Sequence, residues 1–235
     1  MDASGNVTLS RQSGLLSQMD AIANNIANAS TVGFKREGTI FAEFITSSGD
    51  GPSVSMGFAH ARAVDLHQAP VSSTGGNFDF AIEGAGFFLV QTPQGQNLTR
   101  AGSFTPGADG TLQTADGNVL LDAAGSAIVI PPGAHNIMLA QDGSLSADGA
   151  PMAKLGLWAP TDPFTLTHQS GALFSASGYQ PGDGVILQGH LEDSNVDPVG
   201  EVAKMISVQR AYELGQSFLD REDDRTRAVI QTLGR

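Results

Sequence analysis

The sequence predicts a mixed α and β protein, in which a helix at each end of the chain flanks a central all-β domain. All 11 prolines and most of the 29 glycines lie between residues 37 and 199, whereas both ends lack proline, which interrupts helices. The middle also holds 16 acidic and 3 basic residues in a chain of net charge -12, whereas the ends are close to neutral. This uneven composition indicates that the two ends form one structural part and the middle another.

Apolar residues near the N-terminus follow a helical period. Leu15, Met19, Ile22, Ile26 and Ala29 are spaced by 4, 3, 4 and 3 residues, like the a and d positions of a coiled coil. The run stops before Gly33, which can take the left-handed conformation that closes a helix. We therefore expect a helix that ends at this glycine.

A second helix is predicted at the C-terminus. Asp197 is a suitable N-cap and Pro198 a suitable first helical residue, and the helix would be about 50 Å long. One stripe of this helix is expected to contain residues spaced alternately by 3 and 4: Val202, Met205, Gln209, Tyr212, Gln216, Leu219, Asp223, Thr226, Ile230 and Leu233. Other apolar residues fall off this stripe, namely Ile206, Val208, Leu214, Phe218 and Val229. Two helices share only one seam, so the pair is expected to be coiled-coil-like and to present further apolar surface to the central domain or to other chains.

The sequence pattern in the middle of the chain predicts short strands separated by turns. The expected strands include residues 87–90, 119–121, 127–130 and 155–158. Asp-Gly pairs, which suit tight hairpin turns, begin at Asp50, Asp109, Asp116, Asp142, Asp148 and Asp183. Calcium loops are the alternative, but the acidic residues do not follow the ligand spacing of such a loop.

These patterns divide the chain into four parts. Residues 1–36 and 199–235 are the expected terminal-helix assembly domain, residues 37–75 an extended connector, residues 76–185 a β-rich outer domain and residues 186–198 a return linker. The connector is rich in Ser, Gly and Thr, with scattered apolar residues and room for strands of its own. So long a connection is unusual in a compact monomer and is expected to lie against neighbouring subunits.

The sequence offers no chemistry typical of an enzyme. The five histidines are isolated and there is no cysteine, so neither a metal site nor a disulfide is expected. No nucleophile elbow, phosphate-binding loop or dinucleotide fingerprint is present, and we expect neither catalysis, nor a cofactor, nor a small-molecule substrate. The acidic charge argues against nucleic acid as a partner. No apolar run is long enough for a membrane span or for the core of a cleaved signal peptide.

Three segments resemble one protein family. Residues 23–35, with Asn24, Asn25 and Asn28 followed by Gly33-Phe34-Lys35, are similar to the N-terminal signature of bacterial flagellar rod and hook proteins. Residues 86–117 are similar to the start of that family's β domain. Residues 191–198 and 209–213 resemble its C-terminal signature. The segments occur in the family's order and span nearly the whole chain.

The resemblance implies a structural role. The opening residues and the short length of the chain are most similar to proximal rod members of the family. A distal-rod-type paralogue is the alternative. A phage tail or adhesin-type subunit is less similar. A rod subunit would self-assemble with other copies and with other rod proteins into the helical drive shaft that transmits motor torque to the hook. It would reside in the basal body, in the periplasmic space, after flagellar type III export without a cleaved signal peptide.

Residues of both signatures and both helices are the expected assembly contacts. Three asparagines in five residues would cap backbone groups or fix the register with a neighbour, although plain solvation is the alternative, as it is for Gln209 and Arg210. Tyr212 is expected to lie in the seam between the two terminal helices. The expected set is Leu15, Met19, Ile22, Asn24, Asn25, Ile26, Asn28, Gly33, Phe34, Asn195, Pro198, Met205, Ile206, Gln209, Arg210, Tyr212 and Phe218.

Overall fold

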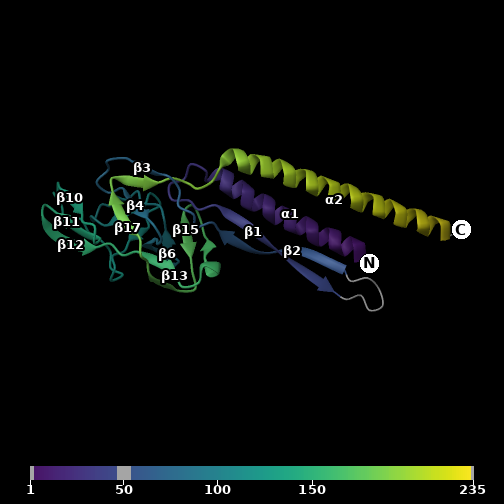
Figure 1. Ribbon diagram of the computed structural model, residues 1–235, viewed down its shortest axis with the longest axis horizontal. Coiled ribbons are helices and arrows are strands. Elements are labelled where there is room, and N and C mark those ends of the chain that lie inside the picture. Colours follow the sequence, from purple (N-terminus) through teal and green to yellow (C-terminus); the bar gives the residue numbers. More distant parts are fainter. Residues whose placement is uncertain (1–2, 47–53, 234–235) are drawn as a thin grey trace. The chain divides into compact units, whose positions relative to one another are not determined.

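The computed structural model describes residues 3–46 and 54–233 of the chain. The chain folds into two compact units (Figure 1). Unit 1 comprises Met1–Ala27, Glu37–Ala63 and Asp197–Arg235, and unit 2 comprises Asn28–Arg36 and Val64–Val196. The terminal helices thus share a unit with much of the segment expected to be a connector, while the short segment after the first helix belongs with the β-rich body.

Unit 1 is built from two helices and a pair of strands. Helix α1 (Ala3–Ala27) packs against helix α2 (Pro198–Leu233), and strand β1 (Glu37–Thr46) pairs with strand β2 (Val54–Val64). Asn25 of α1 contacts Glu201 near the start of α2, whereas Gln12 lies beside Gly215, so the helices are antiparallel. The expected mixed α and β class is confirmed, and part of the expected connector is a β hairpin.

Helix α2 begins where its cap residues predict. The carboxylate of Asp197 accepts a hydrogen bond of 3.1 Å from the backbone N–H of Val199, and Pro198 is the first helical residue. A Cβ atom at Gly200 would lie 2.6 Å from Oδ2 of Asp197, which explains a glycine in the first turn. Helix α1 ends at Ala27, so Gly33 closes a later turn and not the helix itself.

The side of α2 that is shielded from solvent differs from the expected stripe. Its buried or half-buried residues include Glu201, Met205, Val208, Tyr212, Gly215 and Leu219. Gln209 and Gln216 are exposed, because the packed side passes through Val208 and Gly215. Glycine at position 215 lets α1 approach closely, since a Cβ there would lie 3.2 Å from Nε2 of Gln12. Side-chain size at the contact therefore decides which stripe of α2 packs.

Unit 2 is a β-rich body made of several sheets. A seven-stranded sheet has the order β14-β15-β6-β5-β9-β8-β7, and the sheet β10-β11-β12 has three strands. Three pairs complete it: β13 with β16, β17 with β4 and β18 with β3. The strands are β3 (Val71–Ser73), β4 (Phe80–Glu83), β5 (Phe88–Thr92), β6 (Gly95–Thr99), β7 (Thr105–Pro106), β8 (Leu112–Gln113), β9 (Val119–Leu120), β10 (Ile137–Leu139), β11 (Ser144–Ala147), β12 (Ala150–Lys154), β13 (Trp158–Pro160), β14 (Thr167–His168), β15 (Leu173–Ser175), β16 (Tyr179–Pro181), β17 (Val185–Gln188) and β18 (His190–Glu192), with a 3-10 helix η1 (Pro163–Thr165).

Both faces of strand β5 are buried, which explains its uninterrupted apolar sequence. Phe88 and Val90 belong to one hydrophobic cluster, whereas Phe87 and Leu89 belong to a second. Successive side chains of a strand point to opposite faces, so a run without alternation fits a strand covered on both sides. Two other expected strands are not regular: residues 127–130 make only isolated bridges, and β13 begins at the last residue of the segment 155–158.

The Asp-Gly pairs at Asp109, Asp116, Asp142 and Asp148 form turns of more than one kind, whereas the expected turn at Asp183 is wrong, because Asp183-Gly184 lies in no turn and Gly184 does not have positive φ. Asp148 and Gly149 both have positive φ and join β11 to β12 by a two-residue connection, as expected for a tight hairpin turn. At Asp109 and Asp142 only the following glycine has positive φ. There the aspartate carboxylate accepts the backbone N–H of the residue two positions on, which is Thr111 or Ser144. The pair at Asp50 lies outside the described residues.

Candidate functional site

Asn25 holds together three elements of unit 1. Its side chain is fully buried, and its Oδ1 accepts the backbone N–H of Glu37 at 2.8 Å while its Nδ2 donates to the carbonyl of Glu37 at 2.8 Å. The amide thus pairs with the backbone of β1 as a neighbouring strand would. Nδ2 also donates to Oε2 of Glu201 at 3.1 Å, so one side chain links α1, β1 and α2.

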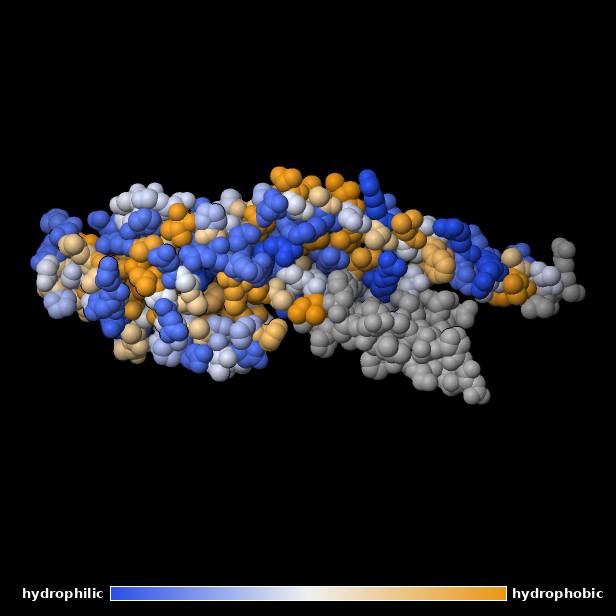
Figure 2. Space-filling model, in the orientation of Figure 1, coloured by the Kyte–Doolittle hydropathy of each residue, from blue (hydrophilic) through white to orange (hydrophobic). Residues whose placement is uncertain are grey.

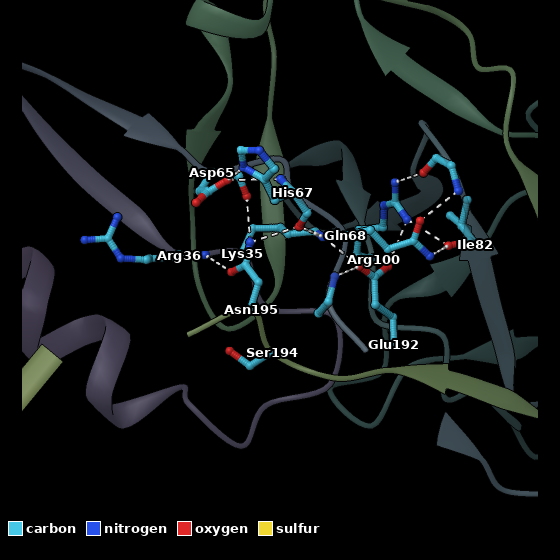
Figure 3. A network of polar contacts seen from close by, with 12 residues as sticks. Lys35, Arg36, Asp65, His67, Gln68, Ile82, Arg100, Glu192, Ser194 and Asn195 are labelled. Carbon is cyan, nitrogen blue, oxygen red and sulfur yellow. Dashed lines mark hydrogen bonds and ion pairs between the residues drawn. The ribbon is translucent and has the colours of Figure 1, made fainter. Parts of the chain in front are cut away.

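A second polar cluster lies inside unit 2 and centres on Glu192 (Figure 3). One carboxylate oxygen lies 2.6 Å from Nζ of Lys35, and the other lies 2.8 Å from Nη1 of Arg100. All three side chains are almost completely buried. Glu192 Oε1 also accepts the backbone N–H of Ala69 at 2.9 Å. Two buried cations therefore share one buried anion.

Backbone carbonyls accept further hydrogen bonds from both cations of this cluster. Nζ of Lys35 donates to the carbonyl of His67 at 2.7 Å, and Arg100 donates to the carbonyls of Ile82 and Gly84. Burial lowers the pKa of Lys35 and of Arg100 from their ordinary values, and the carboxylate of Glu192 opposes that effect in both. Hydrogen bonds to the other polar atoms reduce the cost of burying such ion pairs, and here they leave Nε of Arg100 as a buried donor without a partner among the described residues.

Asn195 ties the segment after α1 to the strands of unit 2. Its Oδ1 accepts the backbone N–H of Arg36 at 2.6 Å, and its Nδ2 donates to the carbonyls of Asp65 at 2.9 Å and His67 at 3.0 Å. The backbone N–H of Gly33 donates to the carbonyl of Glu192 at 2.8 Å. Residues 33–36 therefore run beside residues 192–195 within unit 2 and are held by both backbone and side chains.

Gly33 is required by space as well as by conformation. Its φ is 70°, which is the left-handed region anticipated from the sequence. A Cβ atom at this position would lie 2.2 Å from the backbone nitrogen of Ala101 and 2.2 Å from the carbonyl carbon of Arg100. A side chain there would collide with the backbone of Arg100 and Ala101, so glycine is required by space.

Phe34 follows directly and is completely buried in unit 2. Its ring lies 5.1 Å from the ring of His168 in an edge-to-face arrangement, and His168 in turn lies 5.2 Å from the ring of Phe174. Such pairs stabilise beyond simple burial. In this conformation Phe34 packs within its own chain and presents no surface to another.

The other residues expected to make assembly contacts lie mostly on the two helices. Ile22 is buried, and Leu15, Met19, Asn24, Ile26, Met205 and Tyr212 are half-buried. Pro198, Ile206, Gln209, Arg210 and Phe218 are exposed. Asn28 belongs to unit 2, where its Oδ1 accepts the hydroxyl of Thr31 at 3.1 Å. Figure 2 shows apolar side chains along the outer edge of α2, and the exposed apolar residues of this helix are Val199, Val202, Ile206, Leu214, Phe218, Val229 and Ile230.

The sequence did not indicate the charged residues of the two polar junctions, which are the Asn25 contacts in unit 1 and the Glu192 cluster in unit 2. Lys35, Arg100 and Glu192 each lie inside one of the three family-like segments, but none is among the expected assembly contacts. Arg100 is one of only three basic residues in the acidic middle, and this rarity is the one sequence feature that could have indicated a buried ion pair there. Burial of lone charges depends on partners up to 157 residues away, so no local pattern could identify them.

Three family models match successive parts of the chain: "Flagella basal body rod protein" over residues 6–35, "Flagellar hook protein FlgE/F/G D1 domain" over residues 81–147 and "Flagellar basal body rod FlgEFG protein C-terminal" over residues 187–232. The flagellar basal-body rod protein FlgF of Caulobacter vibrioides is 37% identical over 244 residues, which cover 100% of this chain and 99% of that protein. The chain belongs to the flagellar basal-body rod protein family. The predicted resemblance to rod and hook proteins is thereby confirmed.

Further relatives place the chain near FlgF within this rod family. FlgF of Mesorhizobium japonicum is 35% identical over 97% of this chain and 96% of that protein. The rod protein FlgG of Caulobacter vibrioides is 32% identical over 93% of this chain and 96% of its own length. The matched rod-family segments contain the junction residues described above: Asn25, Gly33, Lys35, Arg100, Glu192, Asn195 and Glu201.

Neither a membrane-spanning helix nor a metal centre is found among the residues that the structure describes. Neither α1 nor α2 is long and apolar enough to cross a lipid bilayer, within the residues that the structure describes. Over the same residues, no group of three or more His, Asp and Glu side chains is placed to hold a metal ion.

Proposed function

We propose that this protein is a structural subunit of the flagellar basal-body rod, which assembles helically with other copies and with other rod proteins to transmit motor torque to the hook. The observation that carries the proposal is the full-length similarity to FlgF proteins, together with the apolar outer side of α2. Contacts between chains that repeat head to tail without closing generate a helical filament. The role needs no catalytic group, cofactor or small-molecule substrate.

In this proposal unit 1 forms the assembly part and unit 2 the outer part. The helices of unit 1 pair in a coiled-coil-like manner, which the alternating spacing of Glu201, Met205, Val208, Tyr212 and Gly215 on the shielded side of α2 supports. The exposed residues Ile206 and Phe218 lie outside this seam and make contacts between chains. Val202, Gln209 and Arg210 of the same helix are also available to neighbouring subunits.

The two polar junctions give each unit a defined internal geometry. Asn25 joins three elements of unit 1, and Glu192 with Asn195 holds residues 33–36 inside unit 2. A subunit that transmits torque must resist deformation, and buried hydrogen-bonded networks favour one arrangement of the segments that they join. We infer that the family-like segments serve this internal rigidity, while the exposed apolar residues of the helices serve assembly.

The location follows from the same proposal: the subunit resides in the rod, in the periplasmic space, after export without a cleaved signal peptide. The test is deletion of the encoding gene, complementation with an epitope-tagged copy, and electron microscopy of purified basal bodies with labelled antibody. Label on the proximal rod supports the proposal. Label on the distal rod favours a FlgG-type role, for which the similarity to FlgG is the basis. Absence of label from basal bodies of motile cells would overturn the proposal.

A further inference from the structure

A groove lies between α1 and α2 within unit 1. Its volume is about 400 Å³, and it is lined by Thr8, Arg11, Gln12, Leu15, Ala211, Leu214, Gly215 and Phe218. Leu214 is 69% exposed and Phe218 44% exposed, so both present apolar surface at this groove. Gln12 is 9% exposed, and its Nε2 is a buried donor without a hydrogen-bond partner among the described residues. The groove therefore combines apolar walls with one unsatisfied donor.

The C-terminal end of α2 is exposed to solvent. Pairing of Asn25 with Glu201 and of Gln12 with Gly215 places the start of α1 near residue 224, so the last residues of α2 continue past it (Figure 1). Residues 223–232 are all exposed. Val229 and Ile230 form a small apolar side, 52% and 64% exposed, together with Thr226 one turn earlier.

The last turn of α2 also offers hydrogen-bond acceptors. An α-helix ends with about four carbonyl groups that have no partner within the helix, and its C-terminus carries partial negative charge. The groove offers a complementary group, because Nε2 of Gln12 is a donor without a partner among the described residues. Apolar side chains and polar groups thus match between the groove and the helix end.

A chain cannot place the end of α2 in its own groove. Gly215 and Val229 belong to one uninterrupted helix, and 14 residues at about 1.5 Å each separate them by about 20 Å along its axis. The occupant must therefore come from another molecule. Because the groove and the helix end are different surfaces, such a contact leaves a free groove on one chain and a free end on the other, as a growing filament requires.

We propose that the groove between α1 and α2 receives the C-terminal end of α2, residues 225–233, from a second copy of this chain. The inference rests on the proposed function and names the contact through which two copies join. Val229 and Ile230 of one copy pack on Leu15, Leu214 and Phe218 of the other. The carbonyls of the last turn accept the hydrogen bond of Gln12.

The natural chain has no cysteine, which permits a direct test. Full-length Leu214→Cys and full-length Ile230→Cys are mixed at high concentration with a mild oxidant, and the heterodisulfide is quantified by intact mass spectrometry. The matched control replaces Ile230→Cys by Gln231→Cys, which is exposed and lies 100° further round the helix from Ile230, away from Val229. A disulfide needs Cα atoms within about 7 Å, so the two pairs are distinguishable.

The expected result is at least about tenfold more heterodisulfide with Ile230→Cys than with Gln231→Cys. Equal yields, or no heterodisulfide with either, would overturn the inference. Sedimentation velocity supplies a second measurement: Gln12→Glu, which faces a carboxylate toward the incoming carbonyls, should weaken self-association about tenfold, whereas Ser13→Glu, exposed on the same helix, should not. Equal association of the two variants would also count against it. Labelling of basal bodies decides the proposed function separately, so a labelled rod with no selective disulfide refutes only the groove contact.

Discussion

The side-chain amide of Asn25 donates a hydrogen bond to Oε2 of Glu201 at 3.1 Å, which joins residues 176 positions apart in the sequence. The same amide pairs with the backbone N–H and carbonyl of Glu37. Asn25 and Glu201 are both buried, so these hydrogen bonds are shielded from bulk solvent. One uncharged side chain therefore links α1, β1 and α2.

Replacement of Asn25 should destabilise unit 1 strongly. Asn25→Leu leaves two backbone groups of Glu37 without partners, each at a cost of about 1–3 kcal/mol, so we expect a total loss of about 2–6 kcal/mol. Urea unfolding followed by circular dichroism at 222 nm, where the helices dominate, measures it. Ser13→Ala, at an exposed position of the same helix, is the control and should change little. A midpoint unchanged in Asn25→Leu would show that the junction is dispensable.

Removal of the buried anion in unit 2 should lower the free energy of unfolding more than removal of one buried cation. Glu192→Gln leaves two buried cations without an anion, and we expect a loss of about 3–5 kcal/mol in the free energy of unfolding. Lys35→Met leaves one cation paired with one anion, so its effect should be clearly smaller. Hydrogen exchange of residues 64–196 reports unfolding of this unit. The reverse order of the two variants would contradict the charge balance assigned to the cluster.

Two glycines with the same φ provide a matched test of space at the exit from α1. Gly33 and Gly75 both have φ of 70°, but a Cβ would meet backbone atoms at Gly33 and nothing within 4 Å at Gly75. Asparagine tolerates the left-handed region, so Gly75→Asn should cost about 1 kcal/mol or less. Gly33→Asn should cost several times more, as thermal unfolding of both variants will measure. Similar melting temperatures would mean that conformation alone matters at Gly33.

Substitutions at exposed residues of α2 should affect assembly, whereas substitutions at its buried residues should affect folding. Ile206→Asp combined with Phe218→Asp changes residues that are 45% and 44% exposed, so the unfolding transition of unit 2 should stay nearly unchanged while incorporation into rods stops. Val208→Asp, only 7% exposed, should instead unfold the helix pair, because it buries a charge without a partner. Thermal unfolding and basal-body labelling provide the two measurements. Normal rods with the double variant would exclude this side of α2 from assembly.

Two turns of unit 2 should show a pH dependence at acid pH. The side-chain hydrogen bond from Thr111 lowers the pKa of Asp109, and the backbone hydrogen bond from Ser144 lowers that of Asp142, below the ordinary value. Because the folded pKa is lower than the unfolded one, these bonds stabilise the fold above the ordinary pKa and are lost as pH falls through the folded pKa. Carboxyl chemical shifts recorded during an NMR titration test this directly. Thr111→Val should return the pKa of Asp109 toward its ordinary value and leave that of Asp142 unchanged.

The sequence alone determined the features that depend on neighbouring residues. Asp197 and Pro198 mark the start of α2 because a cap acts within one helical turn, and both were identified in advance. Gly33 was expected to take positive φ for the same local reason. The class of the fold and the family also followed from local signals, namely proline distribution, periodicity and three short segments in order.

Only the tertiary structure decided which partners those residues have. Asn25 was expected to cap a helix or to reach a neighbouring chain, yet it pairs with Glu37 and Glu201 of its own chain. The seam of α2 passes through Val208 and Gly215, and not Gln209 and Gln216, because close packing depends on the facing helix. Long-range contacts set the burial of Lys35, Arg100 and Glu192, and neither period nor composition encodes a contact between segments so far apart in the chain.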